Sequence, residues 1–246
     1  KPVKPLPVRK IKSKVPLTNC FIAPCEHGCP INQDIPEYIR LVGDKKYGEA
    51  LTLILERNPL PFITGRICSH RCMDKCTRGF YEESVHIRDA KLLAAREGFD
   101  GIIDSLKPSG VSNAKVAVIG GGPAGMAAGY LLGRQGAEVT VFEKRAELGG
   151  IVRYVIPGFR IGDFGIDRDV DLLRAMGAEI KTNTTAPSVA ELKKSGYTHV
   201  IFATGAWAHG NLKLDAGESM NVLDFLEQYK CESLKDFGEH VIIVGG

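Results

Sequence analysis

The stretch KVAVIGGGPAGMAAGYLLGRQGAEVTVFEKRAELGG, residues 115–150, decides the fold of this chain. Four apolar residues lead directly into Gly120-x-Gly122-x-x-Gly125, which predicts a buried strand that ends in a glycine turn. A helix is expected next, and the run EVTVFE then predicts a second strand that ends at Glu143. A glycine turn alone could belong to any α/β protein. Strand, turn, helix, strand and acid in this order indicate a dinucleotide-binding unit.

Each part of this pattern has a chemical reason. Backbone N–H groups in the first turn of the expected helix would point at a pyrophosphate, and Gly122 has no side chain to keep it away. Glu143 lies eighteen residues after Gly125, where a carboxylate can accept hydrogen bonds from a ribose. We therefore expect the pyrophosphate at residues 120–125 and the adenosine ribose at Glu143.

The residues after Glu143 favour FAD over NAD. The run KRAELGG and the later HVIFATGA, residues 199–206, resemble the FAD-binding half of the two-dinucleotide-binding-domain flavoproteins. Trp207 follows this second run and either shields the flavin or fills a gap. The resemblance implies the following cofactor-binding residues: Gly120, Gly122, Pro123, Ala124, Gly125, Glu143, Lys144, Gly149, Gly150, Ile151, Arg160, Thr204 and Gly205.

Length and charge narrow the class of protein. At 246 residues with 44% hydrophobic content, the chain can bury a full core, and no run is long enough to span a membrane. The 32 basic and 29 acidic residues give a net charge of only +3, which argues against a nucleic-acid surface. With no signal peptide visible, we expect a cytoplasmic protein.

Six of the seven cysteines gather in CFIAPCEHGCP and RICSHRCMDKC, which bracket a helical stretch. Disulfides are not expected beside a nucleotide fold in a cytosolic composition. Zinc is the main alternative, since four thiolates can close a tetrahedral site. Cys29-Pro30 after closely spaced cysteines is typical of iron–sulfur proteins, and clustered thiolates near a flavin provide a route for single electrons. We therefore favour iron–sulfur clusters over zinc.

The chain resembles the glutamate synthase small subunit and the N-terminal region of dihydropyrimidine dehydrogenase. The matching stretches are LTNCFIAPCEHGCPINQDIPEYIRL, RNPLPFITGRICSHRC and IPGFRI. Within that iron–sulfur flavoprotein family the chain looks most similar to selenate reductase flavoprotein subunits. The resemblance implies two [4Fe-4S] clusters. It assigns Cys20, Cys25 and Cys76 to one and Cys29, Cys68 and Cys72 to the other.

The chain departs from the family pattern at one ligand of each cluster. The first expected cysteine falls on Leu17, and the fourth ligand of the second cluster falls near Lys91, a poor iron ligand when protonated. His27 and His70 are possible replacements, although each is more often a solvated or capping histidine. We predict two clusters, each with three cysteines and a non-cysteine or open fourth position.

The pattern of elements indicates an α/β fold with an N-terminal all-α domain. Residues 1–18, with four prolines and six Lys or Arg, form a linker or a basic docking arm. Residues 19–110 form the helical iron–sulfur domain, and 111–238 form a Rossmann-like FAD-binding domain with a parallel sheet. HVIIVGG predicts another strand that enters a glycine turn, so residues 239–246 are expected to begin a truncated NAD(P)H-binding domain.

Individual elements follow from periodicity and capping. Two helices are expected between Asp34 and Asn58, with a break at Gly43-Asp44. Further helices are expected over residues 87–99, 126–135, 165–176, 188–194 and 222–229, and strands over 116–119, 138–143, 179–182, 199–203 and 241–246.

The sequence thus predicts an electron-transfer module of an NAD(P)H-dependent FAD and iron–sulfur oxidoreductase. The resemblance implies that a nicotinamide on the following domain reduces FAD, and that electrons pass through the clusters to a substrate site on another domain or a separate catalytic subunit. We find no catalytic acid, base or nucleophile in this segment. The alternatives are a glutamate synthase small subunit that feeds an amidotransferase partner and a zinc-stapled, non-catalytic binding domain.

Overall fold

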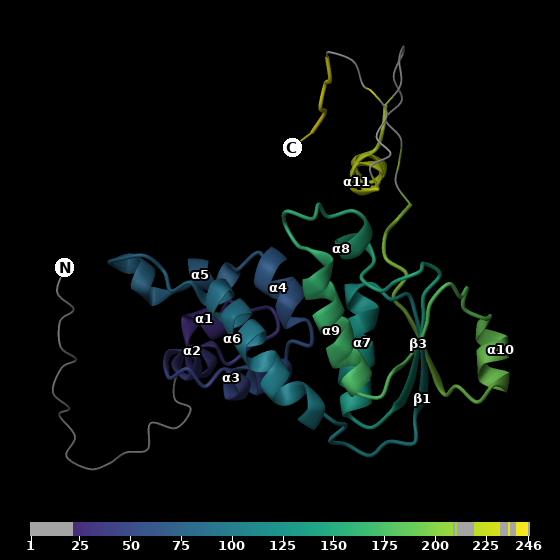
Figure 1. The fold of residues 1–246 in the computed structure, drawn as a ribbon, viewed down its shortest axis with the longest axis horizontal. Helices are drawn as coiled ribbons and strands as arrows, with labels where there is room; N and C mark the ends of the chain where they lie inside the picture. Colours follow the sequence, from purple (N-terminus) through teal and green to yellow (C-terminus); the bar gives the residue numbers. More distant parts are fainter. Residues whose placement is uncertain (1–21, 209, 211–218, 232–235, 237–239, 246) are drawn as a thin grey trace.

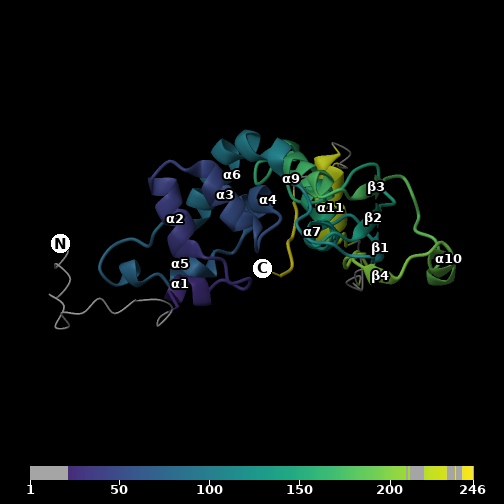
Figure 2. The same cartoon turned by 90° about the horizontal axis from the view of Figure 1, so that it is seen from below.

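The computed structural model describes residues 22–208, 210, 219–231, 236 and 240–245. A helical region and a four-stranded sheet lie side by side, with helices α7 and α9 between them (Figure 1). The view from below shows the same order, with α10 on the far side of the sheet (Figure 2). The predicted α/β architecture with an N-terminal all-α region is confirmed. None of the helices described is long and apolar enough to cross a membrane.

The sheet is parallel, with strand order β3-β2-β1-β4. β1 pairs with β2 from Lys115↔Glu138 to Ile119↔Phe142, and with β4 up to Ile119↔Phe202. The chain therefore builds outward from β1 to β3 and then crosses back to place β4 on the other side of β1. The carboxyl ends of β1 and its neighbours meet at this switch point, where α/β sheets bind ligands. The strands are β1 Lys115–Ile119, β2 Glu138–Phe142, β3 Glu179–Lys181 and β4 His199–Phe202.

Alternating side chains give the sheet two apolar faces. Val116, Val118, Val139 and Val141 are buried toward α7 and α9, whereas Ala117, Phe142 and their neighbours pack against Leu192 of α10. This alternation follows from the twofold repeat of a strand. The helices of this part are α7 Pro123–Arg134, α8 Ile151–Tyr154, α9 Asp163–Ala175, α10 Val189–Lys194 and α11 Val222–Lys230.

The helical region is built from short helices. Asp34 caps α2 by accepting a hydrogen bond from the Glu37 N–H at 3.1 Å, and Pro36 lies in the first turn, as the sequence predicts. The expected break separates α2 from α3. The elements are α1 Pro24–His27, α2 Ile35–Gly43, α3 Tyr47–Leu55, α4 Pro61–Ile67, α5 Arg71–Asp74, η1 Thr77–Phe80, α6 Ile87–Ile102 and η2 Ile103–Ser105.

A single apolar core joins the helical region to the sheet. Phe62 of α4 and Phe99 of α6 belong to the same buried cluster as Val118 of β1 and Leu173 of α9. The two phenyl rings meet edge to face at 5.6 Å, and the Arg168 guanidinium lies 4.4 Å from the Phe99 ring centre. Residues on both sides of position 110 therefore share one interior.

The structure differs from the sequence prediction in several elements. α7 begins at Pro123, earlier than residue 126, because a proline fits the first turn of a helix. The short helices α1, α4 and α5 were not expected. The strand expected over residues 241–246 is not formed across the described residues 241–245: Val241 to Val244 are exposed and pair with no described strand. The linker over residues 1–18 lies outside the described residues.

Candidate functional site

The glycine turn brings three backbone segments into close contact. Gly120 has φ +106°, and a Cβ there would lie 2.4 Å from the Ala203 carbonyl oxygen. A Cβ on Gly125 would lie 1.9 Å from the Gly120 carbonyl oxygen. Both positions therefore need glycine to close the turn onto β4. Gly122 is different, because its φ is −72° and the nearest contact of an added Cβ would be the Gly150 Cα at 3.8 Å. The protein leaves the space beside Gly122 free.

Glu143 is held at the end of β2 by backbone donors. The Gly121 N–H donates to its Oε2 at 2.7 Å, and the Arg145 N–H donates to its Oε1 at 2.9 Å. The residue is 7% exposed. Each carboxylate oxygen keeps a further lone pair, so the group remains able to accept hydrogen bonds from a ribose. Its position beside the glycine turn is the one the sequence predicts.

A cavity of about 270 Å³ opens at the switch point of the sheet. The glycine turn forms its floor, the Gly149-Gly150 turn forms one side, and the segment after β4 forms another. Ten of the predicted cofactor-binding residues line it: Gly120, Gly122, Pro123, Ala124, Glu143, Lys144, Gly150, Ile151, Thr204 and Gly205.

The other three predicted residues do not line the cavity. Gly125 lies behind the turn in the first turn of α7. Gly149 has φ +123°, and a Cβ there would lie 2.8 Å from the Arg153 Cβ, so it shapes the loop. Arg160 is exposed in the loop before α9. A cofactor contact by Arg160 stays a prediction.

The cavity also contains residues that sequence reasoning missed. Thr184, Thr185 and Ala186 follow β3 and line it, and a rule that ligands contact the carboxyl ends of parallel strands would have found them. Arg145 lines it too. The Arg145 guanidinium lies 4.4 Å from the ring centres of both Tyr154 and Trp207.

Arg145 also joins the cavity to α11, because its Nη1 donates to Glu227 Oε1 at 2.5 Å. Trp207, whose role the sequence left open, therefore forms a wall of the cavity and packs against a cation. This arrangement fixes the segment after β4 against the residues that follow β2.

The cysteines converge from two segments. α1 packs against α5, which brings Cys25 and Cys29 toward Cys72 and Cys76. Cys76 is near enough to Cys25 for its charge to raise the pKa of the Cys25 thiol, and Cys29 and Cys68 act in the same way on Cys72. These are the groupings that the family resemblance implies. Cys20 lies outside the described residues. None of the described cysteines forms a disulfide.

Burial raises the pKa of both the Cys25 and Cys72 thiols. Lys91 is 5% exposed beside Cys68, Cys72 and Cys29: burial lowers its pKa, and the three thiolates oppose that change. Burial also raises the pKa of the Tyr38 phenol, which faces Cys72 and Cys29. Burial thus disfavours the thiolate forms of Cys25 and Cys72, and the Lys91 cation opposes this effect at Cys72.

His70 lies beside Cys68, one of the expected cluster ligands. The His70 N–H donates to Cys68 Sγ at 3.4 Å, and His70 adopts φ +44°. The Nδ1 atom of His70 is buried and has no hydrogen-bond partner among the described residues. His27, by contrast, is exposed. His70 thus fits a non-cysteine ligand better than His27 does.

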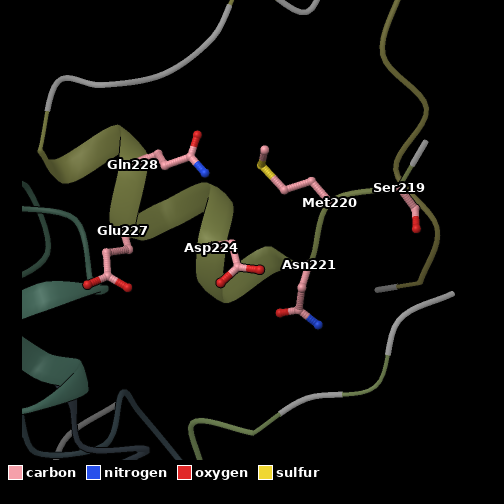
Figure 3. Close-up of a pocket in the computed structure, with 6 residues that line it drawn as sticks. All are labelled: Ser219, Met220, Asn221, Asp224, Glu227 and Gln228. Atoms are coloured by element: carbon pink, nitrogen blue, oxygen red, sulfur yellow. The ribbon is translucent and has the colours of Figure 1, made fainter.

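No three His, Cys, Asp or Glu side chains of the described residues converge closely enough to hold a single metal ion. A cubane cluster is larger than one ion, so its thiolate ligands stand farther apart. A separate hollow of about 370 Å³ lies beside α11 (Figure 3). It is lined only by residues 219–228 among those described, and it contains none of the predicted site residues.

Comparisons with known proteins agree with both sites. Residues 16–99 match the family model described as dihydropyrimidine dehydrogenase domain II, 4Fe-4S cluster. Residues 118–174 match the NAD(P)-binding Rossmann-like domain. The chain is 43% identical over 242 residues to YgfK of Escherichia coli, which is named as an oxidoreductase, covering 96% of this chain and 23% of that protein.

Two further relatives are subunits of larger oxidoreductases. The NADPH-Fe(3+) oxidoreductase subunit beta of Geobacter sulfurreducens is 32% identical, over 92% of this chain and 35% of the relative. The glutamate synthase [NADPH] small chain of Mycobacterium tuberculosis is 34% identical, over 93% of this chain and 51% of the relative. The chain is homologous to these oxidoreductases. It spans between 23% and 51% of the length of these relatives.

The homology confirms the family recognised in the sequence. An iron–sulfur domain precedes a Rossmann-like dinucleotide domain, as expected. The description of the first model also favours iron–sulfur over the zinc alternative. The narrower resemblance to selenate reductase subunits stays a prediction, as do the ligand role of each cysteine and the domain boundaries.

Proposed function

We propose that this chain is the electron-transfer module of an NAD(P)H-dependent oxidoreductase, with FAD in the cavity at the sheet and two [4Fe-4S] clusters at the cysteines. One observation carries the proposal: one buried core joins the helical region to the sheet that bears the dinucleotide cavity, and the thiols pack on a second apolar cluster that α3 and α6 connect to this core. Such connected packing holds two redox groups at a fixed separation, which electron transfer requires. The bound flavin would convert two-electron reduction into single-electron transfer.

The chain's own residues bind and orient the dinucleotide. The N–H groups that open α7 face the place where the pyrophosphate would lie, and the open side of Gly122 lets it approach. Glu143 accepts from the ribose, while Arg145 and Trp207 close the cavity wall. The matched Rossmann model is described as NAD(P)-binding, whereas the turn at Gly149-Gly150 supports FAD. A direct comparison of the two ligands separates these possibilities.

The cysteines would hold the clusters in two sets. Cys29, Cys68 and Cys72 form one, with Lys91 and His70 beside it. Cys25 and Cys76 belong to the other, together with Cys20 outside the described residues. We expect about eight irons per chain, since each cubane contains four. A reproducible four or fewer in anaerobically reconstituted protein contradicts the two-cluster proposal.

The rest of the electron path is proposed to lie on other domains or subunits. The relatives are subunits or parts of larger oxidoreductases, which supports a donor NAD(P)H domain and a separate acceptor site. A glutamate synthase small subunit that feeds an amidotransferase partner is the second candidate, supported by the matched small chain. A cytoplasmic location fits the proposal, because reducing conditions keep clustered thiols available for iron.

Gly122 provides the test of the dinucleotide site. Gly122→Leu should leave the fold intact, because an added Cβ meets no protein atom closer than 3.8 Å, and should abolish FAD binding by filling the pyrophosphate space. The matched control is Gly101→Leu, since a Cβ added at Gly101 has nothing within 4 Å and Gly101 does not line the cavity. FAD and NAD⁺ are titrated into both variants and the parent chain while fluorescence is recorded.

Three outcomes of this titration bear on the proposal. FAD binding by the parent, no binding by the Gly122 variant and parent-like binding by the control support it. Tighter binding of NAD⁺ than of FAD by the parent contradicts the FAD assignment. Unchanged FAD binding in a folded Gly122→Leu variant contradicts the location of the site.

A further inference from the structure

Asp169 of α9 is a fully buried acid whose partners lie in the helical region. It is 0% exposed. Its Oδ1 accepts a hydrogen bond from the Phe62 N–H at 3.1 Å, and its Oδ2 accepts one from the Ile63 N–H at 2.8 Å. The partners are separated from Asp169 by more than a hundred residues of sequence. A carboxylate of the dinucleotide domain thus satisfies two backbone donors of α4.

These two N–H groups belong to the first turn of α4, where no intrahelical acceptor exists. Leu60 stands at the N-cap position and provides no side-chain hydrogen bond. Phe62 and Ile63 are buried, so water cannot replace the missing acceptor. Asp169 therefore acts as the cap of α4, supplied from a distant helix.

The far end of α4 carries a thiol. The helix runs from Pro61 to Ile67, and Cys68 follows directly, with its N–H donating to the Thr64 carbonyl at 3.3 Å. Two turns of helix are rigid on this length scale. The position of α4 consequently sets where Cys68 presents its sulfur to Cys29 and Cys72.

Lys91 of α6 is close enough to both ends of α4 for its charge to act on groups at each. Its charge acts on Cys68, Cys72 and Cys29, and it also acts on Asp169. Burial raises the pKa of Asp169, and the Ile63 and Phe62 N–H groups oppose that change. The named charged and dipolar groups that face Asp169 are thus these two amides and Lys91. Of these groups, only Asp169, which accepts the hydrogen bonds from the Phe62 and Ile63 N–H groups, belongs to the dinucleotide domain.

We propose that Asp169 is a positioning residue for the cluster at Cys29, Cys68 and Cys72: by capping α4, the dinucleotide domain fixes the geometry of an iron–sulfur site in the helical domain. The proposal rests on the iron–sulfur function proposed above. It predicts that one cluster, and not the other, depends on Asp169. Cys25 lies in α1 and Cys76 follows α5, and neither belongs to α4 or follows it directly as Cys68 does, so their cluster is an internal control.

The experiment uses the full chain with both clusters reconstituted anaerobically. Asp169→Ala removes both acceptors, and Asp169→Asn keeps one acceptor oxygen. Asp171→Asn is the matched control, because Asp171 lies on the same helix but is partly exposed and paired with Arg174 at 2.9 Å. Iron release to a chelator, the electron paramagnetic resonance spectrum and the reduction potential of each cluster are measured. Cys72→Ser and Cys25→Ser variants assign the signals.

We expect iron of the Cys72-dependent cluster to be released on the order of tenfold faster in Asp169→Ala, by analogy with loss of groups that orient metal ligands. The effect in Asp169→Asn should be smaller. The signal and potential of the Cys72-dependent cluster should shift in both variants, while the Cys25-dependent signal, FAD binding and Asp171→Asn stay at parent values.

Three results overturn the proposal. In the first, both clusters of Asp169→Ala keep parent release rates and potentials. In the second, the two clusters weaken together with FAD binding, which marks Asp169 as a general stability residue. In the third, Asp169→Asn is as damaging as Asp169→Ala, which shows that the acceptor oxygen is not the relevant feature. Failure of the parent chain to bind iron would instead contradict the proposed function itself.

Discussion

The dinucleotide cavity and the cysteine region are built by opposite means. The cavity is made mainly of backbone: Gly120 and Gly122 line its floor without side chains, and the turn behind them closes because Gly125 has none either. The cysteine region works because side chains are present, and it needs thiols from residues 25–29 and 68–76 to meet. Most of the cavity is encoded in one continuous stretch, residues 119–151. The other exists only after the helices have packed.

This difference predicts how each region fails. The cavity should fail when atoms are added, whereas the cysteine region should fail when atoms are removed. Crowding a closed glycine turn costs strain energy, and deleting a ligand removes bonds to a metal group. The variants below test this contrast, starting with the largest effect.

Cys72→Ser should abolish one cluster. Cys72 lies in the field of Cys29 and Cys68, so its loss leaves that set with two thiols. We expect iron content to fall from about eight to about four per chain, with FAD binding unchanged. Iron and flavin are measured on the same anaerobic sample.

Two further cysteine variants serve as comparisons for Cys72→Ser. Cys25→Ser should remove the other four irons, because Cys25 pairs with Cys76. Cys231→Ser should remove none, since Cys231 is exposed at the end of α11. Equal losses in all three variants would mean that the thiols do not form two separate sets.

Gly125→Ala should destabilise the fold, whereas Gly122→Ala should not. The added Cβ at position 125 would lie 1.9 Å from the Gly120 carbonyl oxygen, but at position 122 its nearest contact would be at 3.8 Å. We expect a loss of about 3 kcal/mol in the free energy of unfolding for Gly125→Ala, and a change within about 0.5 kcal/mol for Gly122→Ala. Urea unfolding without added FAD measures both. Comparable losses would show that the two glycines are not distinguished by backbone contact.

The sequence predicted the cavity well for a physical reason. The strand, the glycine turn and Glu143 are local features, and a local pattern fixes them wherever the rest of the chain goes. Ten of the thirteen predicted binding residues line the cavity for the same reason. The residues missed, such as Thr184 and Arg145, enter it through sheet order and side-chain stacking, which no local pattern contains.

The cysteine region was harder to predict in detail. The spacing of the cysteines indicated the chemistry, but α4 was not expected, because its first turn is capped by Asp169 from more than a hundred residues away. The unpartnered Nδ1 of His70 likewise appears only once its neighbours are in place. The strand expected at residue 241 and after was wrong for the described residues, since an apolar run forms a strand only beside a pairing partner.

Glu143→Gln should weaken FAD binding about tenfold, or about 1.4 kcal/mol. The carboxylate accepts from the Gly121 and Arg145 N–H groups, and an amide NH₂ cannot replace one of those acceptors. Glu138→Gln at the other end of β2 is the control, because Glu138 is exposed and pairs with Lys115. Fluorescence titration of FAD gives both affinities, and iron content should be unchanged. An FAD affinity in Glu143→Gln equal to that of the parent chain would contradict a ribose contact by Glu143.

The smallest effect is expected at Trp207. Its ring lines the cavity and lies 4.4 Å from the Arg145 guanidinium, which packs at the same distance against Tyr154. Trp207→Leu loses one cation–π contact and part of the wall, so FAD affinity should fall about threefold, or about 0.6 kcal/mol. Tyr154→Leu loses a cation–π contact to the same guanidinium, but Tyr154 does not line the cavity. If Trp207 acts by direct contact with the ligand, FAD affinity falls in Trp207→Leu alone. Equal losses in the two variants would instead mean that both rings act only by holding Arg145, and the cavity would then depend on a packed side chain in the way the cysteine region does.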